Sequence, residues 1–387
     1  MKALEFDRKQ VRYAAAAVSS RIRPGSGART GPLGLVDQDR KELPGADWQR
    51  VRTLLAGICG SDLATVDGRS ARYFEPWVSF PFVPGHEVLG ELEDGTRVVL
   101  EPVLGHEARG FAPPFDGAAP GDGDDYRHLV TGKLEPGIQT GYCASTGGGW
   151  SSEFVAHNSQ LHRIPDSLSD EEAVMIEPTA VGVHAALRRP IAKGATVAIL
   201  GAGTMGLVAI AALRELTEAG RIIVGAKYPE QKDLAASLGA DDVVDPDEIG
   251  RAVRRATGAF FIGDDLSSGA DVVIDAVGSA SSIDEAIGLT RPRGTVVLVG
   301  MPGRVTVDFT ALWHRETELV GAYTYGTETL GDGSRRTSFD LATELVASAD
   351  LGRLVTASYP LERYEDALEH AANAGRRGTV KVCFDLR

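Results

Sequence analysis

The sequence predicts an α/β protein whose central part is a parallel sheet with helices on both faces. Two observations predict it: a glycine-rich turn between an apolar run and a helical pattern at residues 196–217, and a regular alternation of strand and helix patterns from there onward. Strands that alternate with helices of this length form right-handed βαβ units, which build parallel sheets. The length of 387 residues allows a second domain with its own core.

The glycine-rich turn is the centre of this prediction. Its pattern is Gly201-x-Gly203-x-x-Gly206, directly after the apolar run. Gly201 permits the tight turn, Gly203 lets the backbone approach a pyrophosphate, and Gly206 lets the helix pack closely on the strand. The phosphates are expected on the free N–H groups that open the helix, at Thr204 and Met205. The sequence therefore predicts a dinucleotide-binding site here.

The strand and helix patterns follow in order along the chain. After the turn, strands are expected at 196–200, 221–226, 271–277, 295–299 and 318–324, and helices near 203–217, 229–239, 282–290 and 337–348. Elsewhere, strands are expected at 1–6, 51–56, 152–156 and 378–385, the last returning to the first domain. Residues 21–32 hold too much Gly, Pro and Arg for a core element, and residues 101–150 form a loop-rich excursion.

The composition is that of an ordinary globular chain, with 24% charged residues. The formal net charge of −14 disfavours binding to nucleic acids or anionic membranes. Three cysteines are too few for a disulfide framework, no apolar stretch is long enough to span a bilayer, and no signal-peptide pattern opens the chain. We expect a cytoplasmic protein without a membrane or nucleic-acid partner.

Three residue types with metal-binding chemistry lie far apart in the sequence. Cys59 stands in Gly57-Ile-Cys-Gly-Ser-Asp62, the Gly85-His86-Glu87 sequence comes 27 residues later, and Glu177 precedes a proline at the start of a helical pattern. A thiolate, an imidazole and a carboxylate are the ligand types of an open catalytic zinc site. Each also has a structural interpretation: a core cysteine, a turn after Pro-Gly, and an acidic residue at a helix N-terminus.

Some aromatic and imidazole side chains are ambiguous. Trp77, Phe80 and Phe82 precede the candidate metal histidine, and they either form a pocket wall or belong to the core. His157 and His162 flank a turn, and we expect them to be surface or structural residues rather than ligands.

The order of the motifs resembles that of the zinc-dependent medium-chain dehydrogenase family, especially its alcohol, polyol and sugar dehydrogenase branch. The shared motifs are Met1-Lys-Ala, Gly57-Ile-Cys-Gly-Ser-Asp62, Val83-Pro-Gly-His-Glu87, Glu177-Pro178, the glycine turn and Asp275-Ala-Val-Gly278. They extend over nearly the whole chain, most weakly over residues 7–50. The resemblance implies a GroES-like β-rich catalytic domain at 1–180 and 325–387, and a Rossmann domain with a doubly wound parallel sheet at 181–324.

The resemblance also implies roles for the candidate metal residues. Cys59 and His86 would bind the catalytic zinc, Glu177 would be a further ligand, and Glu87 would be a ligand or a carboxylate that exchanges with the substrate oxygen. Ser61 would hydrogen-bond the zinc-bound hydroxyl and pass on its proton. The alcohol then releases a hydride to the nicotinamide, which the protein only positions.

The carboxyl ends of the strands are where ligands bind in such folds. We therefore expect the backbone of Val277, Gly278, Val299 and Gly300 to line the nicotinamide site. The resemblance further implies that Lys381 reaches the cofactor phosphates.

Two features of many relatives are missing. Four closely spaced cysteines hold a structural zinc in those relatives, whereas here residues 101–142 contain no cysteine and Cys143 stands nearby. We expect no structural zinc, and a lobe that packing or a subunit contact stabilises, or that is mobile. The histidine that continues the proton relay five residues after the zinc cysteine is replaced by Ala64. The proton then leaves Ser61 through the cofactor ribose, through water or through another group.

The position that selects the cofactor also departs from the NAD-specific pattern. NAD-specific members carry an acidic residue at the end of the second nucleotide strand, which binds the ribose 2′-hydroxyl. Ala226 occupies that place and Lys227 follows. A small residue followed by a cation suits a 2′-phosphate, so we expect NADP to be preferred over NAD. The alternative is that Lys227 is an ordinary surface lysine.

Together, these features predict one catalytic zinc and hydride transfer between a nicotinamide cofactor and a secondary alcohol of a polyol, sugar or cyclitol, or its ketone. A zinc-free enone or quinone reductase of the same fold and a non-catalytic NADP-binding protein are the alternatives. Because the apolar strand expected at 318–324 offers a sheet edge, we expect a homodimer or homotetramer.

Overall fold

The computed structural model describes residues 1–263 and 265–387 and divides them into two compact units. One unit comprises Met1–Glu177 and Asp350–Arg387, and the other comprises Pro178–Ala349. This division falls later in the chain than the boundary predicted at residues 324 and 325. Residues up to 349 stay with the second unit because Glu328 pairs with His184 at 2.7 Å and accepts a hydrogen bond from Ser338 at 2.6 Å.

The unit Pro178–Ala349 is built on a six-stranded parallel sheet with the order β10-β9-β8-β13-β14-β15. The strands are β8 (Thr196–Leu200), β9 (Arg221–Gly225), β10 (Asp242–Val244), β13 (Ala270–Asp275), β14 (Thr290–Leu298) and β15 (Glu318–Gly321). The chain starts in the middle of the sheet and winds outward in both directions. This order is that of a doubly wound dinucleotide-binding sheet, so the predicted fold is confirmed.

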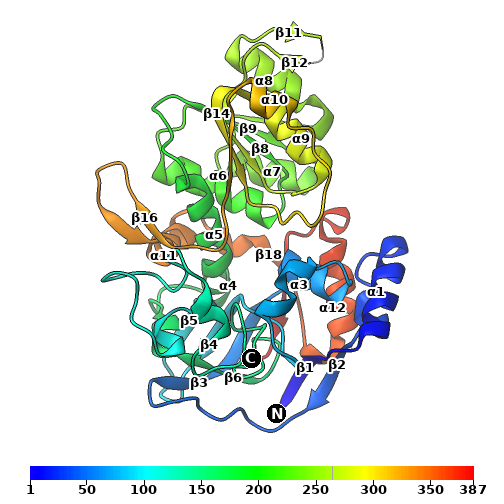
Figure 1. Ribbon diagram of the computed structural model, residues 1–387, viewed down its shortest axis with the longest axis vertical. Helices are drawn as coiled ribbons and strands as arrows, with labels where there is room; N and C mark the ends of the chain where they lie inside the picture. Colours follow the sequence, from blue (N-terminus) through cyan, green and yellow to red (C-terminus); the bar gives the residue numbers. More distant parts are fainter. Residues whose placement is uncertain (264) are drawn as a thin grey trace. The chain divides into compact units, whose positions relative to one another are not determined.

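Helices cover both faces of this sheet. They include α6 (Thr204–Leu216), α7 (Pro229–Ser237), α8 (Ile249–Thr257) and α9 (Ala280–Leu289), and Figure 1 shows α6 and α9 on opposite sides of the strands. Ile249 and Val253 of α8 and Ile283 and Ile287 of α9 pack into one apolar cluster with the strands. Because both faces are covered, the central strands contain continuous apolar runs, such as Val197–Leu200 and Ile222–Val224, instead of alternating.

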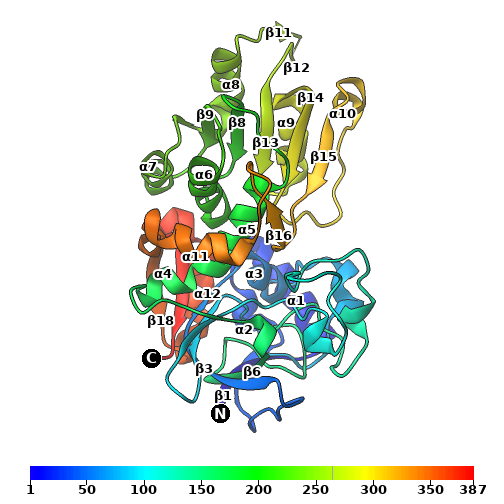
Figure 2. The same ribbon diagram turned by 90° about the vertical axis from the view of Figure 1, so that its left-hand side faces the viewer.

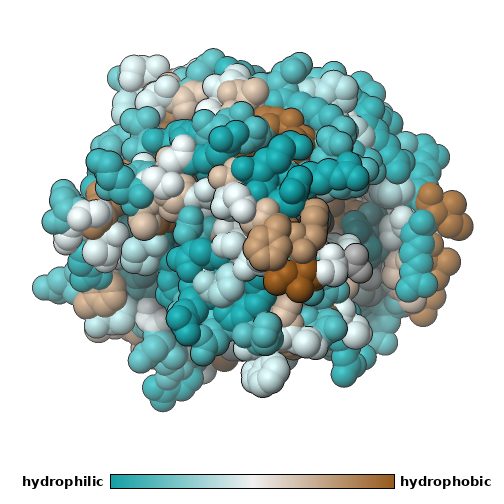
Figure 3. Space-filling view, turned by 90° about the horizontal axis from the view of Figure 1, so that it is seen from above, coloured by the Kyte–Doolittle hydropathy of each residue, from teal (hydrophilic) through white to brown (hydrophobic). Residues whose placement is uncertain are grey.

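Further elements of this unit were not all predicted. They are α5 (Ile176–Leu187), which begins in the other unit, α10 (Thr310–His314), β16 (Thr327–Thr329), β17 (Arg335–Thr337), α11 (Ser338–Ser348), and a short antiparallel pair, β11 (Phe261–Ile262) with β12 (Asp265–Leu266). Phe260, Phe261 and Ile262 of that pair are exposed, and Figure 3 shows apolar side chains amid a mostly hydrophilic face. Every described helix is too short or too polar to traverse a lipid bilayer.

The unit with both chain ends is rich in β structure. Its seven-stranded sheet runs β18-β19-β3-β4-β5-β7, with β6 also paired to β3. The strands are β3 (Trp48–Gly57), β4 (Val88–Glu91), β5 (Arg97–Leu100), β6 (Glu153–His157), β7 (Leu161–Arg163), β18 (Val355–Tyr359) and β19 (Lys381–Asp385). β19 pairs antiparallel with β3, so the C-terminal strand returns to this unit, as predicted. Figure 2 shows β3, in blue, and β18, in red, within this unit.

Shorter elements surround this sheet. They are β1 (Lys2–Phe6), which pairs with β2 (Leu33–Asp37), and the helices α1 (Gln10–Ile22), α2 (Gly27–Thr30), α3 (Gly60–Val66), α4 (Asp170–Val174) and α12 (Tyr364–Ala372). The prediction of no core element at residues 21–32 is wrong for α2. Gly27 is buried, and a Cβ atom there would lie 2.2 Å from the Val66 carbonyl oxygen. The glycine serves close packing rather than a loose loop.

A lobe of residues 101–146 contains the short 3-10 helices η2 (Glu107–Arg109) and η3 (Arg127–Val130). Arg109 is 1% exposed and lies at its centre. Its guanidinium group donates hydrogen bonds to the carbonyl oxygens of Thr131, Leu134, Glu135 and Gly137 over 2.6–3.3 Å. One buried cation thus ties the loop 131–137 to η2 through hydrogen bonds within the chain.

Replacing Arg109 with Met should destabilise the protein by about 2–4 kcal/mol, because buried carbonyl oxygens lose their donors. Thermal or urea unfolding measures this change. The control is Arg127→Met in the same lobe, whose side chain is 87% exposed and pairs with Asp125. The control should change stability by less than about 1 kcal/mol. Equal effects of the two substitutions would contradict the role of Arg109.

Candidate metal and dinucleotide sites

The structure brings three of the predicted metal residues together. The donor atoms of Cys59, His86 and Glu87 lie within 4.8 Å of one another, the one such group of three or more among the described residues. Cys59 follows the end of β3 and caps α3, while His86 and Glu87 precede β4. Because β3 and β4 are antiparallel neighbours, the end of one strand meets the start of the other at one edge.

The turn that presents His86 needs glycine at position 85. Gly85 has a φ of +94°, in the left-handed region, and a Cβ atom there would lie 2.4 Å from Cδ1 of the fully buried Trp150. Any other residue would both strain the backbone and collide with the indole. Close packing against Trp150 therefore explains why glycine precedes the histidine.

Asp62 orients the histidine. Its Oδ1 lies 3.3 Å from Nδ1 of His86, and its other oxygen accepts a hydrogen bond from the Cys59 backbone N–H. Burial lowers the pKa of His86. The Asp62 and Cys59 side chains raise it by more than burial lowers it, so the pKa lies well above its ordinary value. A carboxylate beside Nδ1 leaves Nε2, which is 3.5 Å from Ser61 Oγ, as the nitrogen available to a metal.

Glu87 forms a buried ion pair with Lys381 of β19. Both side chains are at most 3% exposed, and the ammonium group also donates to the Ile58 carbonyl oxygen at 3.4 Å. Burial lowers the pKa of Lys381, but the Glu87 carboxylate, with smaller contributions from Cys59 and Cys383, more than offsets this, and the net shift is upward. Gly57 makes room for the pair, because a Cβ atom there would lie 2.0 Å from Glu87 Oε2.

This position of Lys381 differs from the role that the resemblance implied. Its ammonium group contacts Glu87 and a backbone carbonyl, so the described contacts place it beside the metal group. Contact with the cofactor phosphates stays a prediction. Nothing in the sequence pattern alone indicated the pairing with Glu87, because the two residues lie far apart in the chain.

Glu177 lies in the first turn of α5 and is buried, but it is not part of the group of three. Its role as a further ligand stays a prediction. Phe82 is 3% exposed and stacks on Phe6 with centroids 5.1 Å apart, so it belongs to the core. Phe80 packs against the same cluster, whereas Trp77 is half-buried.

His157 and His162 take structural positions. His157 accepts a hydrogen bond from the Ser159 backbone N–H, capping a short 3-10 helix. His162 lies with Nε2 2.6 Å from a carboxylate oxygen of Glu101. Neither belongs to the group of metal-binding side chains among the described residues.

The glycine turn has the local geometry that the motif predicts. Gly201 has a φ of +93°, and a Cβ atom on Gly206 would lie 1.9 Å from the Gly201 carbonyl oxygen. Gly203 is the N-cap of α6 and has an ordinary φ of −75° with open space beside it. Thr204 and Met205 are the first residues of the helix. Gly206 is therefore needed for packing, whereas Gly203 leaves space for a ligand.

The predicted nicotinamide residues gather at the carboxyl ends of β13 and β14. The buried carboxylate of Asp275 accepts hydrogen bonds from the N–H groups of Val277, at 2.8 Å, and Gly278, at 3.1 Å. The N–H groups of Val299 and Gly300 donate to the Asp275 carbonyl oxygen. Asp275 thus fixes two backbone segments, 277–278 and 299–300, at the edge where the glycine turn also lies.

The cofactor-selecting position carries no acidic side chain. Ala226 is buried, and Lys227 is exposed directly after β9. The ammonium nitrogen of Lys227 lies 5.8 Å from the ring centroid of Tyr228 and makes no ion pair with the residues that the structure describes. A cation is thus available beside the second strand.

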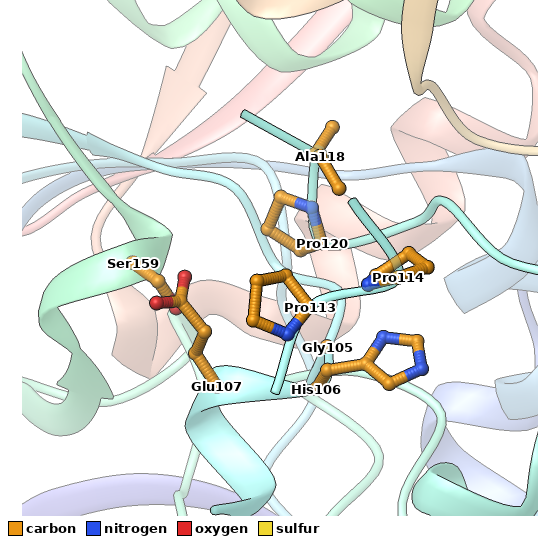
Figure 4. A pocket seen from close by; sticks show the side chains of 9 residues that line it. Gly105, His106, Glu107, Pro113, Pro114, Ala118, Pro120 and Ser159 are labelled. Atoms are coloured by element: carbon orange, nitrogen blue, oxygen red, sulfur yellow. The ribbon is translucent and has the colours of Figure 1, made fainter. Parts of the chain in front are cut away.

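A separate hollow lies in the lobe 101–146. Figure 4 shows that the Glu107 carboxylate is turned towards Ser159 while the His106 imidazole points to the opposite side. The rest of the lining is largely proline, alanine and glycine. Its polar side chains do not converge, so this hollow lacks the arrangement that chemistry or metal binding needs.

Replacing Gly203 or Gly206 with Ala should have different consequences. Gly203→Ala should leave the melting temperature unchanged but weaken nicotinamide dinucleotide binding by about tenfold or more, since the methyl group fills the space that the pyrophosphate needs. Gly206→Ala should destabilise the protein, because its methyl group meets backbone. Calorimetric melting and fluorescence titration with the dinucleotide measure both. Undiminished binding by Gly203→Ala would contradict the assignment.

Comparison with known proteins agrees with this arrangement. Residues 45–166 match the alcohol dehydrogenase GroES-like domain, and residues 204–340 match the zinc-binding dehydrogenase domain. A sorbitol dehydrogenase from Bacillus subtilis (strain 168) is 29% identical over 337 residues, which cover 83% of this chain and 85% of the relative.

Two solved structures share the fold. The crystal structure of 2R,3R-butanediol dehydrogenase from Bacillus subtilis superposes with a TM-score of 0.71 at 21% identity, covering 100% of this chain and 99% of that one. The crystal structure of a zinc-binding dehydrogenase from Sinorhizobium meliloti 1021, solved bound to NADP, superposes with a TM-score of 0.67 at 24% identity. The match covers 91% of this chain and 96% of that one. With both domain types matched in the predicted order, this chain belongs to the zinc-dependent medium-chain dehydrogenase family and is an enzyme of its alcohol and polyol dehydrogenase branch.

Proposed function

We propose that this protein transfers a hydride between a nicotinamide cofactor, preferably NADP, and a secondary alcohol of a polyol, sugar or cyclitol, or the corresponding ketone, with one catalytic zinc. The observation that carries the proposal is the convergence of Cys59, His86 and Glu87 within 4.8 Å, with Ser61 Oγ 3.5 Å from the histidine. The sorbitol dehydrogenase among the relatives supports a polyhydroxylated substrate.

The donor set fits zinc. A thiolate, an imidazole and a carboxylate are common zinc ligands, and Glu87 Oε1 is buried without a hydrogen-bond partner among the described residues. Cys59 and His86 would hold the metal, with Glu87 or Glu177 as a further ligand. A bound zinc would polarise the substrate oxygen and lower the pKa of the alcohol.

The chain's own residues supply the remaining functions. Ser61 lies beside His86 and is placed to accept the proton of the substrate hydroxyl. Asp62 keeps the imidazole oriented, and Lys381 balances the charge of Glu87. The backbone around Asp275 would position the nicotinamide, and the start of α6 would bind the pyrophosphate.

The alternatives are less well supported. A zinc-free enone or quinone reductase would leave three buried metal-type donors together without a use. A non-catalytic NADP-binding protein would have no need of Ser61 beside them. For assembly, we propose a homodimer or homotetramer in which β15, the edge strand of its sheet, pairs across a two-fold axis.

Zinc content per chain tests this function. We expect one zinc per chain after reconstitution of metal-stripped protein, together with polyol oxidation, and both should be lost in Cys59→Ser. Cys143→Ala, which changes another buried cysteine, is the control and should keep the zinc. Two zinc ions per chain would contradict the absence of a structural zinc. No zinc with intact cofactor binding would favour the zinc-free reductase.

Cofactor preference is a second test. Replacing Lys227 with Ala should lower kcat/KM for NADP by about 10- to 100-fold and leave that for NAD nearly unchanged, because only the 2′-phosphate loses a charge-assisted contact. Lys232→Ala, which removes a nearby lysine already paired with Asp245 at 2.8 Å, is the control. A wild-type preference for NAD, or equal kcat/KM values, would contradict the proposal.

A further inference from the structure

The replacement of the relay histidine by Ala64 leaves the route of the proton open. The helix α3 nonetheless carries a second hydroxyl near the metal group. Thr65 lies one helical turn after Ser61, on the same face, and its Oγ1 lies 3.0 Å from the Ser61 carbonyl oxygen. Thr65 is 8% exposed, so its hydroxyl is shielded from bulk water.

Thr65 is the junction of a hydroxyl network. Its Oγ1 lies 2.8 Å from Ser70 Oγ and 3.3 Å from the phenolic oxygen of Tyr142. Tyr142 reaches this point from the end of the lobe 101–146. Either oxygen can be the donor in both contacts. Each hydroxyl can therefore accept one proton while it gives up another.

Tyr142 links this junction to the metal side. Burial raises the pKa of its phenol well above the ordinary value, against hydrogen bonds from Thr65 and Ser61 that lower it. The phenol also lies 3.4 Å from Asp62 Oδ1. Tyr142 thus touches both the serine that faces His86 and the threonine one turn farther along α3.

Tyr13 of α1 is the last member of the hydroxyl network, at the end away from the metal group. Burial raises the pKa of its phenol, and hydrogen bonding by Ser70 lowers it. Both residues are partly exposed, so this end of the network lies nearer the surface than the buried Thr65. The helix α1 precedes the GroES-like domain match at residues 45–166, and it thus gives residues 7–50 a contact with the site.

We propose that a chain of hydroxyl groups replaces the missing histidine as the proton path between the substrate and solvent. Its members, in order, are Ser61, Tyr142, Thr65, Ser70 and Tyr13. The inference rests on the proposed dehydrogenase function and deepens it. Thr65, Ser70 and Tyr13 act through Ser61 and are positioning residues.

The transfer balances at every step. The substrate hydroxyl gives its proton to Ser61 Oγ, whose own proton passes to the phenolic oxygen of Tyr142. The Tyr142 proton passes to Thr65, the Thr65 proton to Ser70, and the Ser70 proton leaves through Tyr13 to water. Thr65 turns its hydrogen from the Ser61 carbonyl to Ser70 for this step. Each oxygen loses one O–H bond and gains another, so no net charge remains on the path.

The test measures proton release apart from turnover. Zinc-loaded protein with bound NADP is mixed with 2,2,2-trifluoroethanol, an alcohol that resists oxidation, in weak buffer with a pH indicator. Thr65→Val and Ser70→Ala should slow the release by about 10- to 100-fold without changing its amplitude. Thr65→Ser should restore the rate. Tyr13→Phe, far from the metal group, gives an independent variant if Thr65→Val does not fold.

Ser20→Ala is the matched control. Ser20 is buried and donates to the Asp67 carbonyl oxygen at 2.9 Å, close to the same helix but off the path. It should release protons at the wild-type rate, and all variants should keep their zinc and NADP affinity. Wild-type release rates in both Thr65→Val and Ser70→Ala would overturn the path. If Thr65→Ser does not restore the release rate, the role of Thr65 is structural, and the path is likewise wrong.

The two proposals fail in different ways. If the wild-type protein binds zinc and NADP but neither releases a proton nor oxidises any alcohol, the dehydrogenase function is wrong. If it oxidises alcohols and the path variants release the proton at the wild-type rate, only the hydroxyl path is wrong.

Discussion

The buried ion pair between Glu87 and Lys381 is the interaction on which the metal group depends. Glu87 lies at the start of β4, Lys381 on β19, and the Gly57 that makes room for them at the end of β3. Three adjacent strands therefore meet at one charged contact. Removing one partner of such a pair costs about 3–5 kcal/mol, because the other charge stays buried. Since β19 comes from the chain's end, this ion pair forms only after both parts of the unit have assembled.

The fold and the clustering of Cys59 with His86 and Glu87 were predictable, because their signals are local or occur in a fixed order. Six consecutive residues determine the geometry of the glycine turn, and Cys59 and His86 lie in short sequence motifs. The partner of Lys381 was not predictable, because strand pairing across the whole unit decides it. The burial of Gly27 against Val66 was not predictable for the same reason. A glycine-rich composition indicates a loop, but a close tertiary contact also requires glycine.

The two units use glycine and charge differently. In the nucleotide unit, the backbone shapes the candidate site: Gly206 lets a helix approach a strand, and Asp275 gathers the N–H groups of Val277 and Gly278. In the other unit, side chains make the site, and a carboxylate holds His86 while a lysine balances Glu87. A pyrophosphate needs many weak donors at fixed positions, whereas a metal needs a few strong ligands, and each arrangement follows from that need.

Hydrogen-bonded side chains organise both the lobe 101–146 and the surroundings of helix α3, and the two arrangements are connected. Arg109 fixes the Gly137 carbonyl at 2.6 Å, and a Cβ atom on Gly137 would lie 2.4 Å from Cys143 Cβ. Tyr142 precedes that cysteine and supplies the phenol beside Thr65. The order that one buried arginine gives to the lobe therefore also sets where this phenol lies. A lobe held by directed hydrogen bonds to its backbone can thereby position a hydroxyl beside the candidate metal group.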